Sequence, residues 1–415
     1  MHGWKKIRLG DVCTMNADSY STRDAWSFVN YLDTGNITDN IIDSIQFINI
    51  EKDKLPSRAK RKVKQNSVIV STVRPNQRHF GIIKTQPDNF LVSTGFVVID
   101  VDDKLLDADF LYYSLSQKNI VESLQTIAEQ STTSYPSITA ADIENLEIEI
   151  PNIIEQKKIA NTLCCLDLKI KQNNKVNDNL EKQAKLIYDY WFNQFEFPDE
   201  NDKPYRSSGG KMKWNKELGR EIPEGWKVES IYLIAELING LACQKYRPKI
   251  GEKSLPVVKI KEMHDGVTSE TEKVSANIPA KYIINDGDIL FSWSATLEVT
   301  YWYGGEAGLN QHIFKVVPNK GFPREYVYHQ LKEYIGIFSK IALSKKTTMG
   351  HITSDHIKQS RITIAPESLA SKYANVVLNI SNKIKILNKE RKELLSLRDY
   401  LLPLLMNGQA ILKDE

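Results

Sequence analysis

The chain contains 415 residues, 41% of them hydrophobic and 26% charged, and its 55 basic and 52 acidic side chains give a formal net charge of +3. This length allows two or three domains with separate hydrophobic cores, and the almost balanced charge neither requires nor excludes a polyanionic partner. The sequence has no run of about 18 apolar residues, which argues against a membrane span. Its four cysteines (Cys13, Cys164, Cys165 and Cys243) have no paired spacing, which argues against a disulfide framework or a zinc site. These features predict a soluble, cytoplasmic protein.

Residues 1–150 are predicted to form a β-rich first body that carries a dense basic run. Between Lys52 and Lys64 seven cationic side chains stand against one acidic side chain, and a polar loop from Ser71 to His79 follows a short apolar strand. Lysines can neutralise DNA phosphates, while Arg and amide side chains can make paired hydrogen bonds to guanine or adenine edges. A basic run alone is typical of a solvated surface, and the polar loop beside it favours DNA. The candidate DNA contacts are Lys60, Arg61, Lys62, Thr72, Arg74, Asn76, Gln77 and Arg78, with Thr133, Ser134 and Tyr135 farther along.

Residues 151–195 predict a long central helix. Its seam positions recur with alternating spacings of three and four residues, which is the heptad pattern of a coiled coil. The seam comprises Leu163, Leu166, Ile170, Asn173, Asn177, Leu180, Ala184, Ile187 and Trp191. The next segment, residues 196–225, is rich in charged residues, Gly, Pro and Ser, and is predicted to be a linker.

Residues 226–365 are predicted to form a second body with a less concentrated set of candidate contacts. The loop that begins at Ser292 occupies the position that the loop beginning at Ser71 occupies in the first body, so the two loops are expected to read different bases. Trp293 is equally compatible with a core ring whose indole N–H is satisfied. The candidates are Lys245, Arg247, Lys261, Ser292, Trp293, Ser294, Thr296, Lys345, Lys346, Thr347 and Thr348.

Residues 366–409 predict a second long helix with its own heptad seam. This seam comprises Val377, Ile380, Ile384, Leu387, Arg391, Leu394, Arg398, Leu401 and Leu405. The two helices are predicted to pack as an antiparallel coiled coil, and about 40 residues at about 1.5 Å each would make a rod of roughly 60 Å. Asn173, Asn177, Arg391 and Arg398 would fix the register of the seam. The alternative is two separate helices, each packed on its own body.

The two halves of the sequence match each other. Aligning Pro151 with Pro366 keeps both helices in register without a gap, since Leu180 then falls on Leu395. Gly3-Trp4-Lys5 corresponds to Gly225-Trp226-Lys227, and Ser67–Ser71 corresponds to Asp288–Ser292. A repeat of this length is a duplicated domain, because solenoid periods are roughly 20–50 residues. The halves share apolar positions and differ in polar side chains, as expected for one scaffold with two binding surfaces.

The sequence lacks the motifs of a self-contained catalytic site. We find no dinucleotide-binding glycine motif, no nucleotide-binding loop of the Walker type, no His-Glu-x-x-His and no Cys-x-x-Cys. The chain also has no consecutive prolines, so the motif that holds a flipped adenine in amino-methyltransferases is missing. His351 and His356 have no acidic or thiol companions that would complete a metal site. The sequence therefore favours recognition over catalysis.

Together these features resemble the specificity subunit of type I restriction-modification enzymes. The resemblance covers the whole chain and is carried by Trp4 to Val12, by the helix entry Pro151 to Ala160, by Gly219 to Trp226, and by Leu401 to Gln409. One departure is the second helix entry, Pro366 to Ser371, which lacks the Glu155-Gln156 pair of the first.

This resemblance implies an α+β fold with two mixed α/β-type target recognition domains in tandem, each followed by a long helix. Each domain would read one half of a split site on double-stranded DNA, and the helical pair would set the spacer between the halves. Two methyltransferase subunits would dock on the helices and bring S-adenosylmethionine for adenine methylation, and motor-nuclease subunits would join for cleavage. The chain itself would hold no cofactor, no metal and no catalytic residues. Two other classes stay open, namely a coiled-coil protein scaffold without DNA specificity and a self-contained nuclease or methyltransferase.

Overall fold

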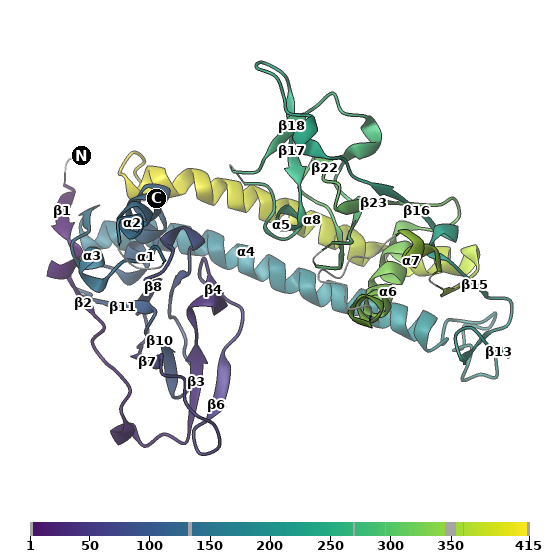
Figure 1. The fold of residues 1–415 in the computed structure, drawn as a ribbon, viewed down its shortest axis with the longest axis horizontal. Helices are drawn as coiled ribbons and strands as arrows, with labels where there is room; N and C mark the ends of the chain where they lie inside the picture. Colours follow the sequence, from purple (N-terminus) through teal and green to yellow (C-terminus); the bar gives the residue numbers. More distant parts are fainter. Residues whose placement is uncertain are drawn as a thin grey trace. The chain divides into compact units, whose positions relative to one another are not determined.

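The chain divides into two compact units, and each unit contains part of both long helices. The computed structural model describes residues 3–131, 135–268, 270–294, 296–344, 354–359 and 361–412. The first unit is Met1–Ile170 with Leu394–Glu415, and the second is Lys171–Glu393. Figure 1 shows the fold, in which the first unit contains the early part of the chain together with its C-terminal end.

The first unit contains two four-stranded sheets and two two-stranded ones, of which the smaller is the hairpin β4 (Ile37–Thr38) and β5 (Ile41–Ile42). One four-stranded sheet has the order β2 (Cys13–Met15), β11 (Phe96–Val101), β8 (Val68–Ser71), β9 (Phe80–Ile82). A second has the order β6 (Gln46–Asn49), β3 (Phe28–Leu32), β10 (Phe90–Ser93), β7 (Ala59–Lys62), with β3 and β10 parallel. The ends of the body are joined by the antiparallel pair β1 (Lys5–Arg8) and β12 (Glu147–Ile150). Strand β8 is buried along its whole length, which explains its continuous apolar run.

The first sheet shares a hydrophobic core with three short helices and with the helical pair. These helices are α1 (Ala108–Ser116), α2 (Lys118–Glu129) and α3 (Ala140–Glu144). Val70, Val97 and Phe110 lie in this core beside Leu163 of the central helix and Leu405 of the C-terminal helix. The body and both helices of this unit are therefore one packed structure.

The second unit repeats the topology of the first. Its four-stranded sheets have the orders β16 (Ala235–Asn239), β23 (Ile313–Pro318), β20 (Ile289–Ser292), β21 (Glu298–Tyr301), and β18 (Lys273–Ser275), β17 (Ser254–Val258), β22 (Ala307–Leu309), β19 (Ile283–Ile284). Strands β17 and β22 are parallel, and β15 (Lys227–Glu229) pairs antiparallel with β24 (Ile362–Ile364). The helices are α5 (Ile260–Asp265), α6 (Arg324–Ser344) and α7 (Ser354–Gln359). The predicted duplication is confirmed in both four-stranded sheets and in the terminal strand pair, with β8 and β20 as equivalents.

Long helices follow both bodies, as predicted. Helix α4 spans Ile153–Tyr188 and continues as a π-helical turn over Asp189–Asn193, and α8 spans Glu367–Met406. At the start of α4, the Gln156 amide donates to the carbonyls of Leu105 (3.1 Å) and Pro151 (2.9 Å) and accepts from the N–H of Asp107 (2.9 Å). The second entry has no glutamine there, and the Tyr326 hydroxyl instead accepts from the N–H of Ala365 (3.1 Å).

Helices α4 and α8 pack antiparallel in each unit. In the first unit the Arg398 guanidinium lies 3.2 Å from the Asp167 carboxylate. In the second, Asn173 donates to Glu390 (2.9 Å), and the Tyr373 hydroxyl donates to the Ala184 carbonyl (3.3 Å). The predicted seam positions on both helices are buried or half-buried. These contacts confirm the antiparallel coiled coil and contradict the alternative of two separate helices.

Polar groups interrupt the seam. Asn173 and Arg398 have the partners just given, and Arg398 also contacts Asp399. Among the described residues, Asn177 Oδ1 and Arg391 Nε are buried without a hydrogen-bond partner, and burial lowers the pKa of Arg391. A shift of the seam by one heptad would separate Asn173 from Glu390 and Arg398 from Asp167, so these pairs favour one register.

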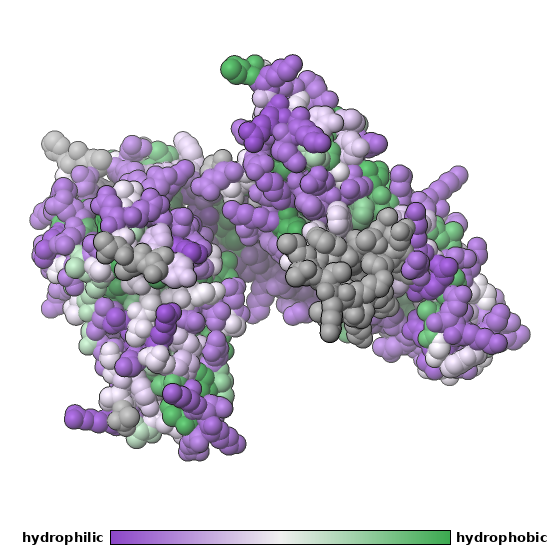
Figure 2. Space-filling model, in the orientation of Figure 1, coloured by the Kyte–Doolittle hydropathy of each residue, from purple (hydrophilic) through white to green (hydrophobic). Residues whose placement is uncertain are grey.

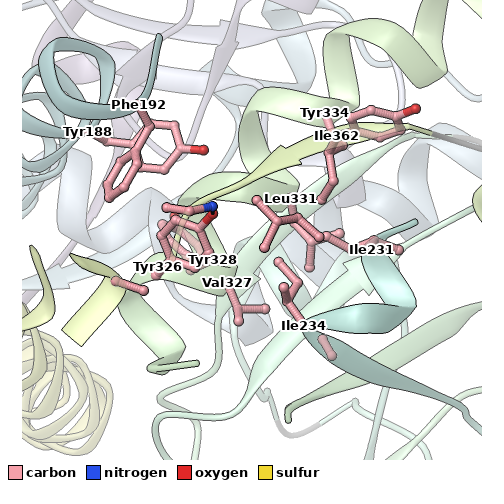
Figure 3. Packing of buried hydrophobic residues seen from close by; sticks show 14 of the residues in the cluster. Tyr188, Phe192, Ile231, Ile234, Tyr326, Val327, Tyr328, Leu331, Tyr334 and Ile362 are labelled. Carbon is pink, nitrogen blue, oxygen red and sulfur yellow. Dashed lines mark hydrogen bonds between the residues drawn. The ribbon is translucent and has the colours of Figure 1, made fainter. Parts of the chain in front are cut away.

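An aromatic cluster joins the end of α4 to the core of the second unit. Figure 3 shows Tyr188 and Phe192 in the same buried cluster as Tyr326 and Val327 of α6. The ring centroid of Phe192 lies 5.0 Å from that of Tyr326 and 5.2 Å from that of Tyr373. Aromatic pairs at such spacings add to the free energy gained by burying their area. The end of α4 is thus part of this core.

The segment from 196 to 225 is folded against that core. It contains the hairpin β13 (Met212–Asn215) and β14 (Arg220–Pro223). The Phe197 ring stacks on Tyr205, with centroids 4.6 Å apart, and on Trp226, with centroids 5.5 Å apart. A composition rich in Gly, Ser and charge predicted a linker, and the few aromatic residues within it supply the contacts that order it.

The buried His329 predicts a pH-dependent stability. Burial lowers its pKa from 6.5 to about 4, and its Nδ1 lies 2.9 Å from the Glu325 carbonyl oxygen and 3.1 Å from the Tyr373 hydroxyl. Between these two pKa values the unfolded chain binds a proton that the native chain does not, so stability present above pH 6.5 is lost as the pH falls. We expect a loss of roughly 3 kcal/mol by pH 4 from this group.

The measurement is urea unfolding of the full chain from pH 7 to pH 4, in the wild type and in His329→Phe. The variant should be less stable at pH 7 but should lose less free energy of unfolding across the window. Equal losses in the two proteins would show that His329 does not titrate as described.

Candidate nucleic-acid interface

The loop that follows strand β8 has an unusual backbone. Pro75–Gln77 form a short 3-10 helix. The residues on either side of it, Arg74 (φ +50°) and Arg78 (φ +57°), have a left-handed backbone conformation. Non-glycine residues rarely adopt this conformation, and such strain is concentrated at functional sites. The loop is therefore held in one shape by its surroundings.

Its main anchor is the segment 135–138. The N–H of Arg74 donates to the Pro136 carbonyl (3.0 Å), and the N–H of Ile138 donates to the Thr72 carbonyl (2.8 Å). From α2, the Gln125 side chain accepts from the N–H of Asn76 (3.2 Å). These bonds fix two loops that are far apart in sequence as one surface, which we call the first loop surface, residues 72–79 with 135–138.

Four predicted residues present their side chains on this surface. Arg74, Asn76, Gln77 and Tyr135 are exposed, and the Arg74 guanidinium lies over the Tyr135 ring, 5.3 Å from its centroid. A cation, two amides and an aromatic ring in one place are the side chains that read base edges and contact phosphates. Thr133 and Ser134 lie outside the described residues.

Other candidates of the first body have side chains that are paired within the protein or partly buried. Lys62 pairs with Asp24 (2.6 Å) and lies 5.5 Å from the centroid of the Trp26 ring. The Thr72 hydroxyl donates to the Gly95 carbonyl (3.0 Å). Arg61 is half-buried, and burial lowers its pKa. Only Lys60 of the basic triplet is exposed. The predicted basic run is thus partly structural.

The loop after β20 repeats a detail of the loop after β8. The Ser71 hydroxyl donates to the Val73 carbonyl (3.1 Å), and the Ser292 hydroxyl donates to the Ser294 carbonyl (3.4 Å) and to the Thr296 carbonyl. Ser292 is fully buried. Its predicted role as a direct DNA contact does not fit this position, because the last residue of the strand points its hydroxyl back into its own loop.

The remaining second-half candidates are more accessible. Lys245, Arg247, Lys261 and Thr296 are exposed, and Ser294 is half-buried. Trp293 is also half-buried; its indole N–H donates to Asn239 (3.2 Å) and its ring centroid lies 6.0 Å from that of Phe314. Lys345, Lys346, Thr347 and Thr348 lie outside the described residues. These candidates come from separate segments of the second body.

Sequence reasoning missed the residues that support the first loop surface. Asp39 and Asn40 form a tight turn with φ of +46° and +64°, and both contact the segment 78–82. A dipeptide of this kind is a recognisable signal for a hairpin turn. Its proximity to Arg78 could not be read from the sequence.

One face of the molecule is mainly polar over its described residues (Figure 2). Most of the face coloured in Figure 2 is hydrophilic, with hydrophobic residues in small groups. Within the described part of the chain no cluster of His, Cys, Asp or Glu is arranged to hold a metal ion. No helix in the same residues is long and apolar enough to span a membrane.

Comparison with known proteins identifies the family. Residues 1–182 and 223–396 match the family described as Type I restriction modification DNA specificity domain. The chain is 26% identical to the type I restriction enzyme HindI specificity subunit of Haemophilus influenzae, over 99% of this chain and 100% of that protein. It is 25% identical to the type I restriction enzyme MjaIX specificity subunit of Methanocaldococcus jannaschii, over 99% and 94%.

A solved structure supports the fold. The S subunit of the type I restriction-modification system from M. genitalium aligns with a TM-score of 0.54 and 16% identity, covering 99% of this chain and 97% of that one. The family match, spanning most of both halves, is the stronger finding. The chain belongs to the type I restriction modification DNA specificity family, as a non-catalytic specificity subunit that recognises the DNA target sequence.

Proposed function

We propose that this chain reads a split site on double-stranded DNA, one half with each body. The observation that carries the proposal is the pair of equivalent loops after β8 and β20. Each begins at a strand-end serine whose hydroxyl donates to a carbonyl of its own loop, and the two loops differ in the side chains that they expose. One scaffold used twice with different side chains is what a two-part sequence requires.

The first half-site would be read by Arg74, Asn76, Gln77 and Tyr135, with Lys60 on nearby phosphates. Thr133 and Ser134, next to Tyr135, remain predicted contacts. The second half-site would be contacted by Lys245, Arg247, Lys261, Ser294 and Thr296, together with Trp293 and the segment Lys345 to Thr348. Residues 1–150 and 226–365 would serve as the target recognition domains, residues 151–195 and 366–409 as the helices that set the spacer, and residues 196–225 as their connection.

The chemistry would come from partner subunits. Two methyltransferase subunits would dock on the helices and supply S-adenosylmethionine for adenine methylation, and motor-nuclease subunits would cleave unmodified DNA in the cytoplasm. Two copies suit the repeated topology, because each half of the chain offers a similar frame. The chain would contribute the choice of sequence.

Methyl transfer tests this division of labour. The chain is purified alone, the methyltransferase alone, and the two as a co-expressed complex, and each is given labelled S-adenosylmethionine and duplex DNA. We expect label in DNA only with the complex, and sequence-selective duplex binding by the complex. A stable complex that ignores duplex DNA would support the protein-scaffold alternative instead.

A further inference from the structure

Arg74 and Arg78, the two arginines of the first loop surface with a left-handed backbone conformation, differ in how their side chains are held. Arg74 is exposed, whereas the Arg78 guanidinium is held on three sides. Its Nε donates to Asp39 Oδ1 (2.6 Å), its Nη1 donates to the Ser116 carbonyl (3.2 Å), and its Cζ lies 4.9 Å from the centroid of the Phe80 ring. The two hydrogen bonds use two of the five N–H groups of the guanidinium, and they fix its direction toward Asp39 and Ser116. By contrast, no hydrogen bond to another described residue fixes the Arg74 guanidinium, which lies over the Tyr135 ring.

The partner of Arg78 lies in a turn that is itself docked on the loop. The N–H of Asp39 donates to the Arg78 carbonyl (3.0 Å), and the N–H of Asn40 donates to the Phe80 carbonyl (2.9 Å). The Asn40 side chain accepts from the N–H of Ile82 (2.9 Å). The backbone and a side chain of this turn therefore form hydrogen bonds with residues 78–82, which follow the loop.

Close packing leaves the turn little freedom. A Cβ atom on Gly81 would lie 2.7 Å from Asn40 Oδ1 and 2.7 Å from the end of the Ile37 side chain. A larger residue at position 81 would displace Asn40 Oδ1, which accepts from the N–H of Ile82, so glycine suits this close approach. The Asp39–Asn40 turn, Gly81 and Arg78 thus form a clamp at the C-terminal side of the loop, and the strained conformation of Arg78 persists because the clamp fixes it.

We infer that Arg78 and Asp39 are positioning residues, which act together to hold the loop so that Arg74, Asn76 and Gln77 can read the first half-site. This inference rests on the proposed function. Arg78 was a predicted DNA contact, and here it supports the loop instead. Recognition of the first half-site then depends on the Asp39–Asn40 turn, through its contact with Arg78.

A double-mutant cycle tests the inference in the complex with the methyltransferase. The variants are Asp39→Gly, Arg78→Gly and the double variant, because glycine accepts the left-handed backbone at both positions. Arg74→Gly is the matched control, with the same backbone conformation but an exposed side chain. Asp39→Asn keeps an acceptor for Arg78 Nε. Duplex binding is measured over a range of salt concentrations, and hydrogen exchange of the 72–82 amides is measured without DNA.

We expect Asp39→Gly and Arg78→Gly to weaken binding by about tenfold each, the double variant to be no worse than either, and the salt dependence to stay unchanged. Both should speed exchange of the loop amides, and Asp39→Asn should restore most of the binding. If Arg78→Gly lowers the salt slope by about 0.9 while Asp39→Gly does not, Arg78 contacts a DNA phosphate directly. If the two effects multiply, Arg78 and Asp39 act independently, which also overturns the inference.

The exchange measurement separates this inference from the proposed function. Faster exchange in both clamp variants, with Arg74→Gly binding DNA as the wild type does, would support the clamp and remove the loop from the DNA interface. Exchange unchanged in both clamp variants would overturn the clamp even if Arg74→Gly impairs binding.

Discussion

Replacing Arg74 with glycine is expected to relax or weaken recognition at one half of the DNA site and to leave the bases of the other half unchanged. Arg74 is exposed at the first loop surface, and the Tyr135 ring beside its guanidinium limits the directions in which it can extend. A bidentate arginine contact to a base is worth about 1–3 kcal/mol, which corresponds to roughly 5-fold to 150-fold in discrimination. Glycine suits the left-handed backbone, so the change reports on the side chain.

The measurement is the map of methylated adenines in cells that express the complex, which gives the preference at every position of the motif. Arg8→Ala is the matched control, since Arg8 is an exposed arginine of the same unit that contacts Asp11 and Asn145. An unchanged motif and methylation rate with Arg74→Gly would remove Arg74 from the interface.

Lengthening both long helices by one heptad is expected to change the spacer of the recognised site and preserve both half-sites. Residues 171–177 of α4 lie opposite residues 386–392 of α8, as the Asn173–Glu390 hydrogen bond shows. Duplicating both segments keeps the heptad phase and copies that bond. Seven residues add about 10 Å of helix, which corresponds to about three base pairs at 3.4 Å each.

The control duplicates residues 171–177 alone, which leaves one helix longer than its partner and should destabilise the pair. The methylation map of the doubly extended protein should show the same two half-sites with a longer spacer. An unchanged spacer, or loss of all methylation by a chain that still folds and binds its partner, would show that the helices do not set the distance between half-sites.

The helices and the duplication could be predicted because their signals are local and periodic. The seam from Leu163 to Trp191 repeats every seven residues, and that period alone requires a long apolar stripe with a partner. The strand Val68–Ser71 is a short apolar run that aligns with Ile289–Ser292, so the equivalence of these two strands could be predicted from the repeat. The folded hairpin within residues 196–225 was missed because composition does not reveal packing on Trp226.

The candidate site was predicted only in part, because a side chain's role depends on contacts that are distant in sequence. Arg74 and Arg78 look alike in the sequence, and only the fold brings Asp39 to one of them and Tyr135 to the other. Ser292 seemed accessible because it begins a polar loop, yet its hydroxyl is buried by that loop. Residue type indicated the kind of partner, and tertiary contacts decided which side chains can reach it.

The most direct test of this account is a methylation map. The chain is co-expressed with its methyltransferase partner in a host that lacks adenine methylation, and the modified positions are sequenced across the genome. We expect a single split motif with a fixed spacer and one methylated adenine in each half. Methylation of one continuous motif, or no methylation from a stable complex, would contradict this expectation.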